Sequence, residues 1–201
     1  MKKWQALFLV SFLIGTALQA QEVYHAGEYI PAVEKRNWVE ISAAATRSFY
    51  RLQDGGKQDQ LTHQTGLSGR ALLVLTPWLG IGAEGTWFEK EKSIAYVPGY
   101  KTIRYGLIGK FTLTPDTQPS VYVLAGTGKT KREFSYAFNL QETDTTSYIL
   151  SGVGLEVSVF RGLFIAAEVD GVYNLHRHVS RFFALNRRWE IEVSARAGIR
   201  F

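Results

Sequence analysis

The chain has 201 residues and a net charge of +5; 46% of its residues are hydrophobic, 20% charged and 13% aromatic, and its mean hydropathy is −0.08. This composition excludes a bundle of membrane helices, which would be far more apolar, and strongly charged disorder. Because there is no cysteine, a disulfide scaffold, a thiolate metal site and a thiol nucleophile are excluded as well.

Residues 1–20 are typical of an export signal. Lys2 and Lys3 precede an apolar run from Leu7 to Leu18, and the small residue Ala20 follows. A transmembrane helix needs ~20 apolar residues, so this run predicts a signal peptide rather than the alternative, a membrane anchor. We expect cleavage after about Ala20. The mature chain then carries 21 basic residues (23 minus Lys2 and Lys3) against 18 acidic ones, or +3. This mild charge gives no reason to expect a nucleic-acid partner.

After residue 37, hydrophobic residues alternate with a period of two, interrupted by Gly and Pro. Such alternation predicts strands with one apolar and one polar face. In the last segment, Trp189, Ile191 and every later odd position are apolar, whereas the even positions are polar, charged or Gly. Eight candidate strands follow one another: 39–49, 68–75, 79–87, 103–113, 121–130, 149–159, 163–173 and 189–201.

The connections between these strands alternate between short and long. The short ones are 76–78, 115–118 and 161–162, and the long ones are about 51–67, 89–102, 131–147 and 175–188. All long loops therefore emerge at one end of a meander, and both termini lie at the other. We predict an all-β fold, an eight-stranded antiparallel up-and-down transmembrane β-barrel over residues 38–201. Residues 21–37 would form a short periplasmic arm.

The polar faces of the strands carry charges that a soluble carrier with an apolar interior could not bury. They suit the narrow lumen of a membrane barrel if they form ion pairs, because eight strands leave an interior just wide enough for side chains. We expect a plugged lumen, with a small porin-like channel as an alternative. The predicted lumen network is Glu40, Arg70, Glu84, Arg104, Lys110, Glu156, Glu168, Asp170, Glu192 and Arg196.

Aromatic residues on the apolar faces indicate two membrane interfaces. Trp189 and Phe201 lie twelve positions apart on one face, which corresponds to roughly 28 Å of height at ~3.3 Å per residue and ~45° tilt. The predicted interface aromatics are Trp87, Tyr105, Tyr173 and Trp189 toward the long loops, and Phe111, Tyr122 and Phe201 toward the short turns.

The signal peptide, the strand pattern, the segment Pro-Ser-Val-Tyr-Val-Leu-Ala-Gly at 119–126 and the terminal Arg-Ala-Gly-Ile-Arg-Phe together resemble the eight-stranded bacterial outer-membrane barrels of the OmpA/OmpX kind. The resemblance covers Trp38–Phe201. It implies the fold and a location in a Gram-negative outer membrane. We expect a monomeric, non-enzymatic scaffold whose loops serve surface recognition, adhesion or envelope integrity. The resemblance also implies that the last strand, ending in Phe201, is presented to the barrel assembly machinery.

The fourth long loop holds several arginines and no acid. At the outer surface it would lie beside the phosphates of lipopolysaccharide, which guanidinium groups bind well. We predict phosphate contacts for Arg177, Arg181, Arg187 and Arg188. The alternative is a solvated loop whose charges contact nothing.

The same loop provides an enzymatic alternative. His178, Ser180 and the later Glu192 are similar to the His-x-Ser plus Glu arrangement of the PagL-type lipid A deacylases. The resemblance implies Ser180 as nucleophile, His178 as base and Glu192 as the group that orients the base. The family's Asn after the serine is Arg181 here. Our principal expectation is no catalytic residue, no cofactor and no metal site, since His25 and His63 are isolated in the sequence.

Overall fold

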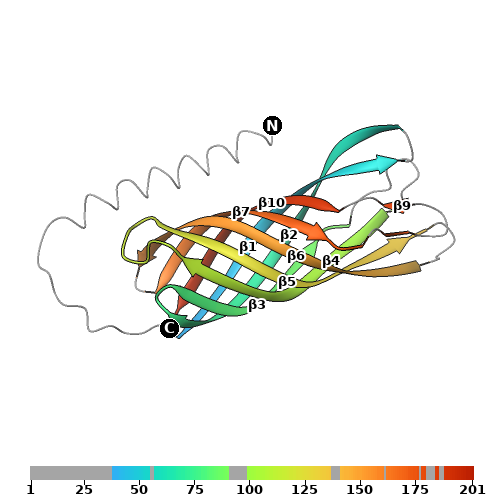
Figure 1. Ribbon diagram of the computed structural model, residues 1–201. Helices are drawn as coiled ribbons and strands as arrows, with labels where there is room; N and C mark the ends of the chain where they lie inside the picture. The colour runs from blue at the N-terminus through green and yellow to red at the C-terminus, as the bar shows by residue number, and fades with distance from the viewer. Residues whose placement is uncertain are drawn as a thin grey trace, which may run out of the picture.

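The computed structural model describes residues 38–54, 57–90, 99–136, 141–160, 162–176, 178–179, 184–185 and 188–201. Eight long strands form a closed barrel, and two short ones, β8 (His178–Val179) and β9 (Ala184–Leu185), form a separate ladder (Figure 1). The barrel strands are β1 (Val39–Asp54), β2 (Lys57–Thr76), β3 (Leu79–Phe88), β4 (Gly99–Thr112), β5 (Ser120–Ser135), β6 (Gln141–Phe160), β7 (Leu163–Asn174) and β10 (Trp189–Arg200).

Each barrel strand pairs antiparallel with its neighbour, in the order β1-β10-β7-β6-β5-β4-β3-β2. The first and last strands close the ring, in a register that runs from Glu40 opposite Arg200 to Tyr50 opposite Glu190. Closure pairs the backbone groups of both outermost strands, which removes the open sheet edges. The predicted eight-stranded antiparallel barrel is confirmed. Among the described residues, no helix is long and apolar enough to cross a membrane.

Two of the predicted long loops are largely strand. β1 and β2 stay paired up to Asp54 and Lys57, and β5 and β6 up to Ser135 and Gln141. The predicted loop ranges 51–67 and 131–147 were therefore too wide. The alternating pattern fades there because side chains beyond an apolar belt are polar on both faces, whereas the strand pairing depends only on the backbone. The two extended hairpins project from the same end of the barrel (Figure 1).

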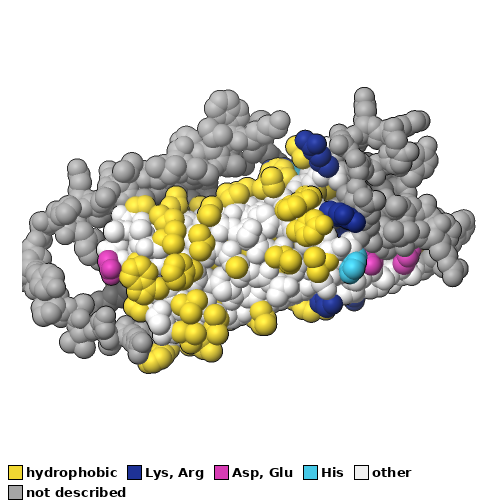
Figure 2. All heavy atoms as spheres, in the orientation of Figure 1, with side chains coloured by type: hydrophobic (Ala, Val, Ile, Leu, Met, Phe, Trp, Pro, Cys, Tyr) yellow, Lys and Arg dark blue, Asp and Glu magenta, His cyan; other side chains and the backbone are white. Residues whose placement is uncertain are grey.

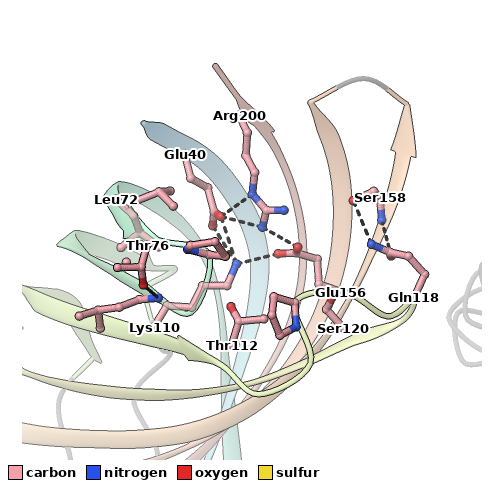
Figure 3. A pocket seen from close by; sticks show the side chains of 15 residues that line it. Glu40, Leu72, Thr76, Lys110, Thr112, Gln118, Ser120, Glu156, Ser158 and Arg200 are labelled. Carbon is pink, nitrogen blue, oxygen red and sulfur yellow. Dashed lines mark hydrogen bonds and ion pairs between the residues drawn. The ribbon is translucent and has the colours of Figure 1, made fainter. Parts of the chain in front are cut away.

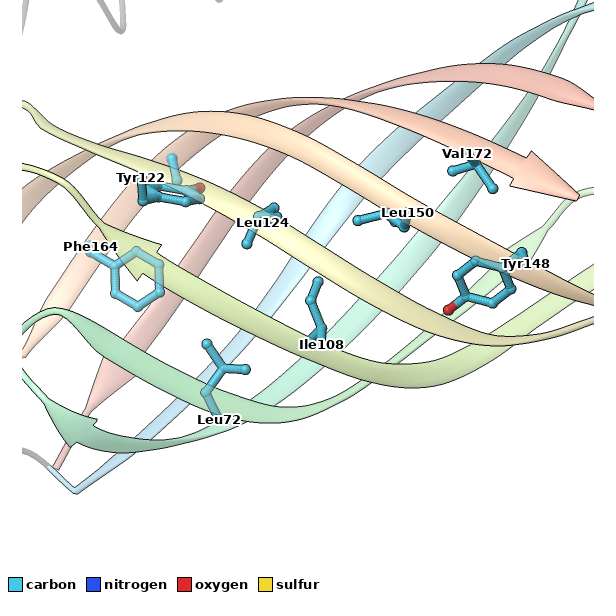
Figure 4. Close-up of a cluster of buried hydrophobic side chains, with 9 residues drawn as sticks. Leu72, Ile108, Tyr122, Leu124, Tyr148, Leu150, Phe164 and Val172 are labelled. Atoms are coloured by element: carbon cyan, nitrogen blue, oxygen red, sulfur yellow. The ribbon is translucent and has the colours of Figure 1, made fainter.

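The barrel has an apolar exterior and a polar interior. Leu107, Val153 and Ile191, on three different strands, are 56–69% exposed on the outer wall. On the face drawn in Figure 2, apolar side chains gather on the outer wall of the barrel. Inside, a small cluster of buried apolar side chains includes Leu72, Ile108 and Leu124 (Figure 4). The sequence pattern placed Ile108 on the polar face of its strand, and it does point into the lumen.

Glycines make room for the large rings inside this narrow lumen. Gly154 lies opposite Tyr122 in the β5–β6 register, and a Cβ atom there would collide with the Tyr122 ring. Gly198 in the same way accommodates the ring of Phe164. Pairing a glycine with a large side chain lets the ring lie flat across the neighbouring strand, which explains why glycine recurs on the inner faces.

Candidate functional site

The lumen layer nearest the short turns contains two bases and two acids, which we call the turn-end quartet: Glu40, Lys110, Glu156 and Arg200. Lys110 Nζ lies 3.1 Å from Glu40 and 2.7 Å from Glu156. Arg200 Nη2 bridges the same two carboxylates at 2.8 and 2.5 Å (Figure 3). The rings of Tyr122 and Phe164 lie against the two cations, each 4.6 Å from ring centroid to charged group. Such contacts partly compensate lost hydration.

A second layer, the central quartet, contains Arg70, Glu84, Glu168 and Arg196. Arg70 donates to Glu84 at 2.5 Å and to Glu168 at 2.6 Å. Arg196 Nη2 lies 3.1 Å from Glu168 and 3.4 Å from Glu84. The Tyr122 hydroxyl donates a third interaction to Glu168 at 2.8 Å. Glu168 on β7 is thus held by side chains from three other strands, because Arg70, Arg196 and Tyr122 come from β2, β10 and β5.

A third layer, the loop-end quartet, contains Arg104, Arg132, Glu190 and Glu192. Arg104 forms ion pairs with Glu192 and with Glu190, the latter at 3.0 Å. Arg132 approaches Glu190 at 3.3 Å. Asn174 and Ser48 also donate to Glu190, at 2.8 and 2.9 Å. These neutral donors satisfy the carboxylate lone pairs that the bases leave open.

The two ends of the lumen differ. At the end of the long hairpins, Tyr50, Phe88, Tyr100 and Phe134 are at most 2% exposed, and the Tyr100 hydroxyl donates to that of Tyr50 at 2.8 Å. Beside the loop-end quartet, a cavity of about 10 Å³ is lined by Glu84, Arg104 and Glu192 among others, which is the space of a single water molecule. At the short turns, the lumen widens into an open pocket of about 600 Å³ whose lining includes the turn-end quartet (Figure 3). The described interior therefore opens toward the short turns as a vestibule.

Asp170 differs from the other lumen acids. It is 3% exposed, faces Glu192 across the β7–β10 register, and its Oδ1 has no hydrogen-bond partner among the described residues. Gly152 on β6 leaves the space that this oxygen occupies. Each quartet contains two bases and two acids, so Asp170 is an additional acid for which no quartet supplies a base.

The structure places all ten residues of the predicted network in the lumen, and nine of them form ion pairs, with Asp170 as the exception. Three members of the quartets were missing from the prediction: Arg132, Glu190 and Arg200. Glu190 and Arg200 have the same even-numbered parity as Glu192 and Arg196, so the alternation could have identified them. Arg132 lies in a segment that had been predicted to be a loop.

The prediction that Tyr122 is a membrane-interface aromatic was wrong. It is 1% exposed and points into the lumen, because its neighbours Val121 and Val123 occupy the outward positions of β5. Of the other predicted interface aromatics, five are 45–70% exposed on the outer wall: Trp87, Tyr105, Phe111, Trp189 and Phe201. Tyr173 is half-buried against Trp189, at 4.6 Å between ring centroids.

Of the residues predicted to bind phosphate or to act in catalysis in the fourth long loop, the structure describes only some. Arg188 is half-buried and its backbone carbonyl accepts the Asn174 N–H at 2.8 Å. Arg177, Arg181 and Arg187 lie outside the described residues, as do Ser180 and the side chain of His178. Glu192 is buried in the lumen in its ion pair with Arg104. The catalytic roles implied for His178, Ser180 and Glu192 therefore stay a hypothesis.

Replacing Glu168 by Gln should strongly destabilise the barrel. The substitution keeps the shape but leaves Arg70 and Arg196 without their shared carboxylate, and breaking a buried ion pair typically costs about 3–5 kcal/mol. Urea unfolding of the refolded protein in lipid vesicles measures this loss. Glu133→Gln is the matched control, because Glu133 pairs with Lys131 on an exposed part of β5 and such pairs contribute little. Equal stability of Glu168→Gln and the wild type would contradict the conclusion that Glu168 neutralises Arg70 and Arg196.

Replacing Asp170 by Asn should instead stabilise the barrel. It replaces a buried carboxyl group that no base neutralises, and we expect a gain of about 1 kcal/mol or more in the free energy of unfolding. Glu192→Gln, the same chemical change at the facing position, should destabilise because Arg104 then loses a partner. The same unfolding assay compares the two, and a loss of stability in Asp170→Asn would overturn this view of Asp170.

No family model matches this sequence, and no curated protein matches it. Solved structures do match. Neisserial surface protein A aligns with a TM-score of 0.63 at 13% identity, covering 81% of this chain and 97% of that one. Ail, the attachment invasion locus protein of Yersinia pestis, aligns with 0.50 at 18%, covering 81% and 98%. The N-terminal β-barrel domain of Pseudomonas aeruginosa OprF aligns with 0.52 at 17%, covering 80% and 96%.

At these identities the similarity concerns the fold. The expected resemblance to barrels of the OmpA/OmpX kind is confirmed at that level, since the similar structures are eight-stranded outer-membrane barrels. The chain has the fold of the eight-stranded outer-membrane β-barrels.

Proposed function

We propose that this protein is an integral barrel of a Gram-negative outer membrane, which acts as a scaffold that displays long hairpins at the cell surface. The observation that carries the proposal is the inverted polarity of the barrel: ion pairs fill its interior and large apolar side chains cover its exterior. Monomeric soluble proteins rarely expose continuous apolar patches beyond a few hundred Å². Lipid is the environment that suits such a wall, and closure leaves no open sheet edge facing it.

The outward aromatics support the orientation. Trp87, Tyr105 and Trp189 lie toward the long hairpins, and Phe111 and Phe201 lie toward the short turns. Two such girdles flank the apolar band of outer-membrane barrels, whose long connections are extracellular. The β1–β2 and β5–β6 hairpins would then project from the cell. We propose surface recognition or adhesion as their role, in keeping with the name of the Ail protein, whose fold is similar.

Export and assembly belong to the same proposal. Residues 1–20 would direct secretion and be removed after about Ala20. The last strand would be recognised by the barrel assembly machinery through its outward apolar residues and Phe201, which is 57% exposed. In the folded barrel the Phe201 carbonyl accepts the N–H groups of Trp38 and Val39 at 3.0 and 3.1 Å, so the last residue of the chain is tied to the first strand. We propose that the protein works as a monomer.

A lipid A deacylase built on His178, Ser180 and Glu192 would behave differently from a scaffold. It would remove one acyl chain from lipid A, a mass change that mass spectrometry of lipid A from expressing cells detects. Glu192 is bound to Arg104 inside the lumen, which favours a structural role for this acid.

A charge on the lipid-facing wall should prevent membrane insertion. Leu107 is 69% exposed between the girdle residues Tyr105 and Phe111, and an Arg within the bilayer costs about 2–4 kcal/mol near the midplane. We expect Leu107→Arg to abolish the heat-modifiable, membrane-bound form that the wild type shows on electrophoresis after cell fractionation. Leu61→Arg is the matched control, because Leu61 is 72% exposed on the projecting hairpin and should tolerate the charge. A soluble wild type, or full insertion of Leu107→Arg, would refute the membrane assignment.

The filled lumen should conduct poorly. Three ion-paired layers and a cap of four aromatic side chains occupy the interior, and the cavity beside the loop-end quartet is about 10 Å³. We expect the purified protein to give no steady ohmic current in a planar lipid bilayer, with a large general porin as the positive control. A stable single-channel conductance would support the porin-like alternative instead.

A further inference from the structure

Three lysines lie side by side on the outer wall of the barrel, just beyond the girdle at the hairpin end. Lys129 pairs with the girdle residue Tyr105 in the β4–β5 register, Lys131 with Ile103, and Glu133 with Lys101. Alternate residues point to the same face and neighbouring strands lie ~4.8 Å apart, so Lys101, Lys129 and Lys131 form one cluster. We call it the lysine patch. Lys101 and Lys129 are exposed and Lys131 is half-exposed.

The surroundings of the lysine patch suit a phosphate group. Lys129 Nζ donates to the Ser147 hydroxyl at 2.9 Å, which leaves two of its protons for a ligand. Thr145 faces Lys131 across the β5–β6 register and adds a second hydroxyl. Two acids lie close to the patch among the described residues. Glu133 lies 2.7 Å from Lys131 Nζ, and the hydrogen bond from Lys131 together with the nearby positive charges lowers its pKa. Glu89 is exposed one position past Phe88, which pairs with Thr102 next to Lys101. The patch therefore keeps a net charge of +1, from three lysines and two acids.

The position of the patch indicates which phosphate it meets. The girdle at this end has Trp87 on β3, Tyr105 on β4, and Tyr173 and Trp189 on β7 and β10. Following the register from Tyr105 across β5 and β6, the facing outward positions are Lys129 and Ser147, so polar residues take the place of the girdle aromatics on these two strands. Basic side chains lie along this edge of the apolar belt (Figure 2).

We propose that the lysine patch binds the phosphorylated headgroup of a glycolipid in the outer leaflet, whose acyl chains pack on the apolar wall below. The inference rests on the proposed membrane location. A lipid is favoured over a soluble anion because the lysines are level with the headgroups and directly above lipid-facing residues such as Leu107 and Ile149, which are 69% and 51% exposed. Basic residues at a membrane surface attract anionic lipid with about 1 kcal/mol each.

The test uses the mature protein refolded in zwitterionic micelles, with bis-phosphorylated lipid A, dephosphorylated lipid A and inositol hexakisphosphate as probes in native mass spectrometry. The combined variant Lys101→Gln, Lys129→Gln, Lys131→Gln should bind lipid A at least tenfold more weakly than the wild type, since each lysine corresponds to roughly fivefold. The wild type should bind dephosphorylated lipid A equally weakly. Heat-modifiable migration confirms beforehand that every variant is folded.

Arg47→Gln provides the matched control. Arg47 is exposed on β1, which lies opposite β5 in the ring, and its guanidinium lies 5.5 Å from the Phe49 ring centroid. The expected result is unchanged lipid A binding for the variant relative to wild type.

Two results would refute the proposed site. In the first, Arg47→Gln weakens lipid A binding as much as the single variant Lys129→Gln does, which would mean that lipid A is attracted to basic residues all around the barrel. In the second, the triple variant binds lipid A as tightly as the wild type. Tighter binding of inositol hexakisphosphate than of lipid A would assign the patch to a soluble anion and refute the lipid. If the wild type inserts into the membrane but does not bind lipid A, only this inference is refuted. If the wild type fails to insert, the membrane location itself is refuted.

Discussion

The structure depends on the neutralisation of charge inside a narrow, water-poor lumen. Charges cannot remain unpaired there without a large loss of hydration, and eight strands leave little space for water to replace it. The barrel meets this requirement in three layers, each with two bases and two acids, in which a carboxylate such as Glu168 or Glu190 contacts two bases and at least one neutral donor. These contacts link strands that are not neighbours in the ring, so the network braces the barrel across its interior.

The two ends of the barrel are built for different surroundings. One end has the long hairpins, the lysine patch and the four buried aromatic residues Tyr50, Phe88, Tyr100 and Phe134, whereas the other end has tight turns and an open vestibule. Ion pairs fill the lumen, and four buried aromatic side chains lie toward the long hairpins. This arrangement supports the proposal that the protein works through its outer surface and its hairpins, with the lumen as a core made of ion pairs.

Much of this could be predicted from alternation alone. Parity decides which face of a strand a residue occupies, and because lipid and lumen demand opposite polarities, it also separates outside from inside. Leu107 and Glu168 are assigned correctly in this way. Tyr122 shows what happens when parity is set aside: its aromatic character suggested the girdle, but its even position and the facing Gly154 put its ring in the lumen. Arg132 was missed because a strand that rises beyond the apolar belt loses its hydrophobic alternation while its backbone pairing continues.

The sequence by itself determined the number of strands in the barrel, their faces and the charged character of the interior, since these follow from a period-two pattern and from short connections. Only the tertiary structure decided which base meets which acid. Arg70 and Glu84 face each other on adjacent strands, but Lys110 and Glu40 meet across the lumen, and that distance depends on the stagger of the closed ring, which no local pattern encodes. For the same reason, the isolation of Asp170 and the proximity of Lys101, Lys129 and Lys131 become visible only once the strands are aligned.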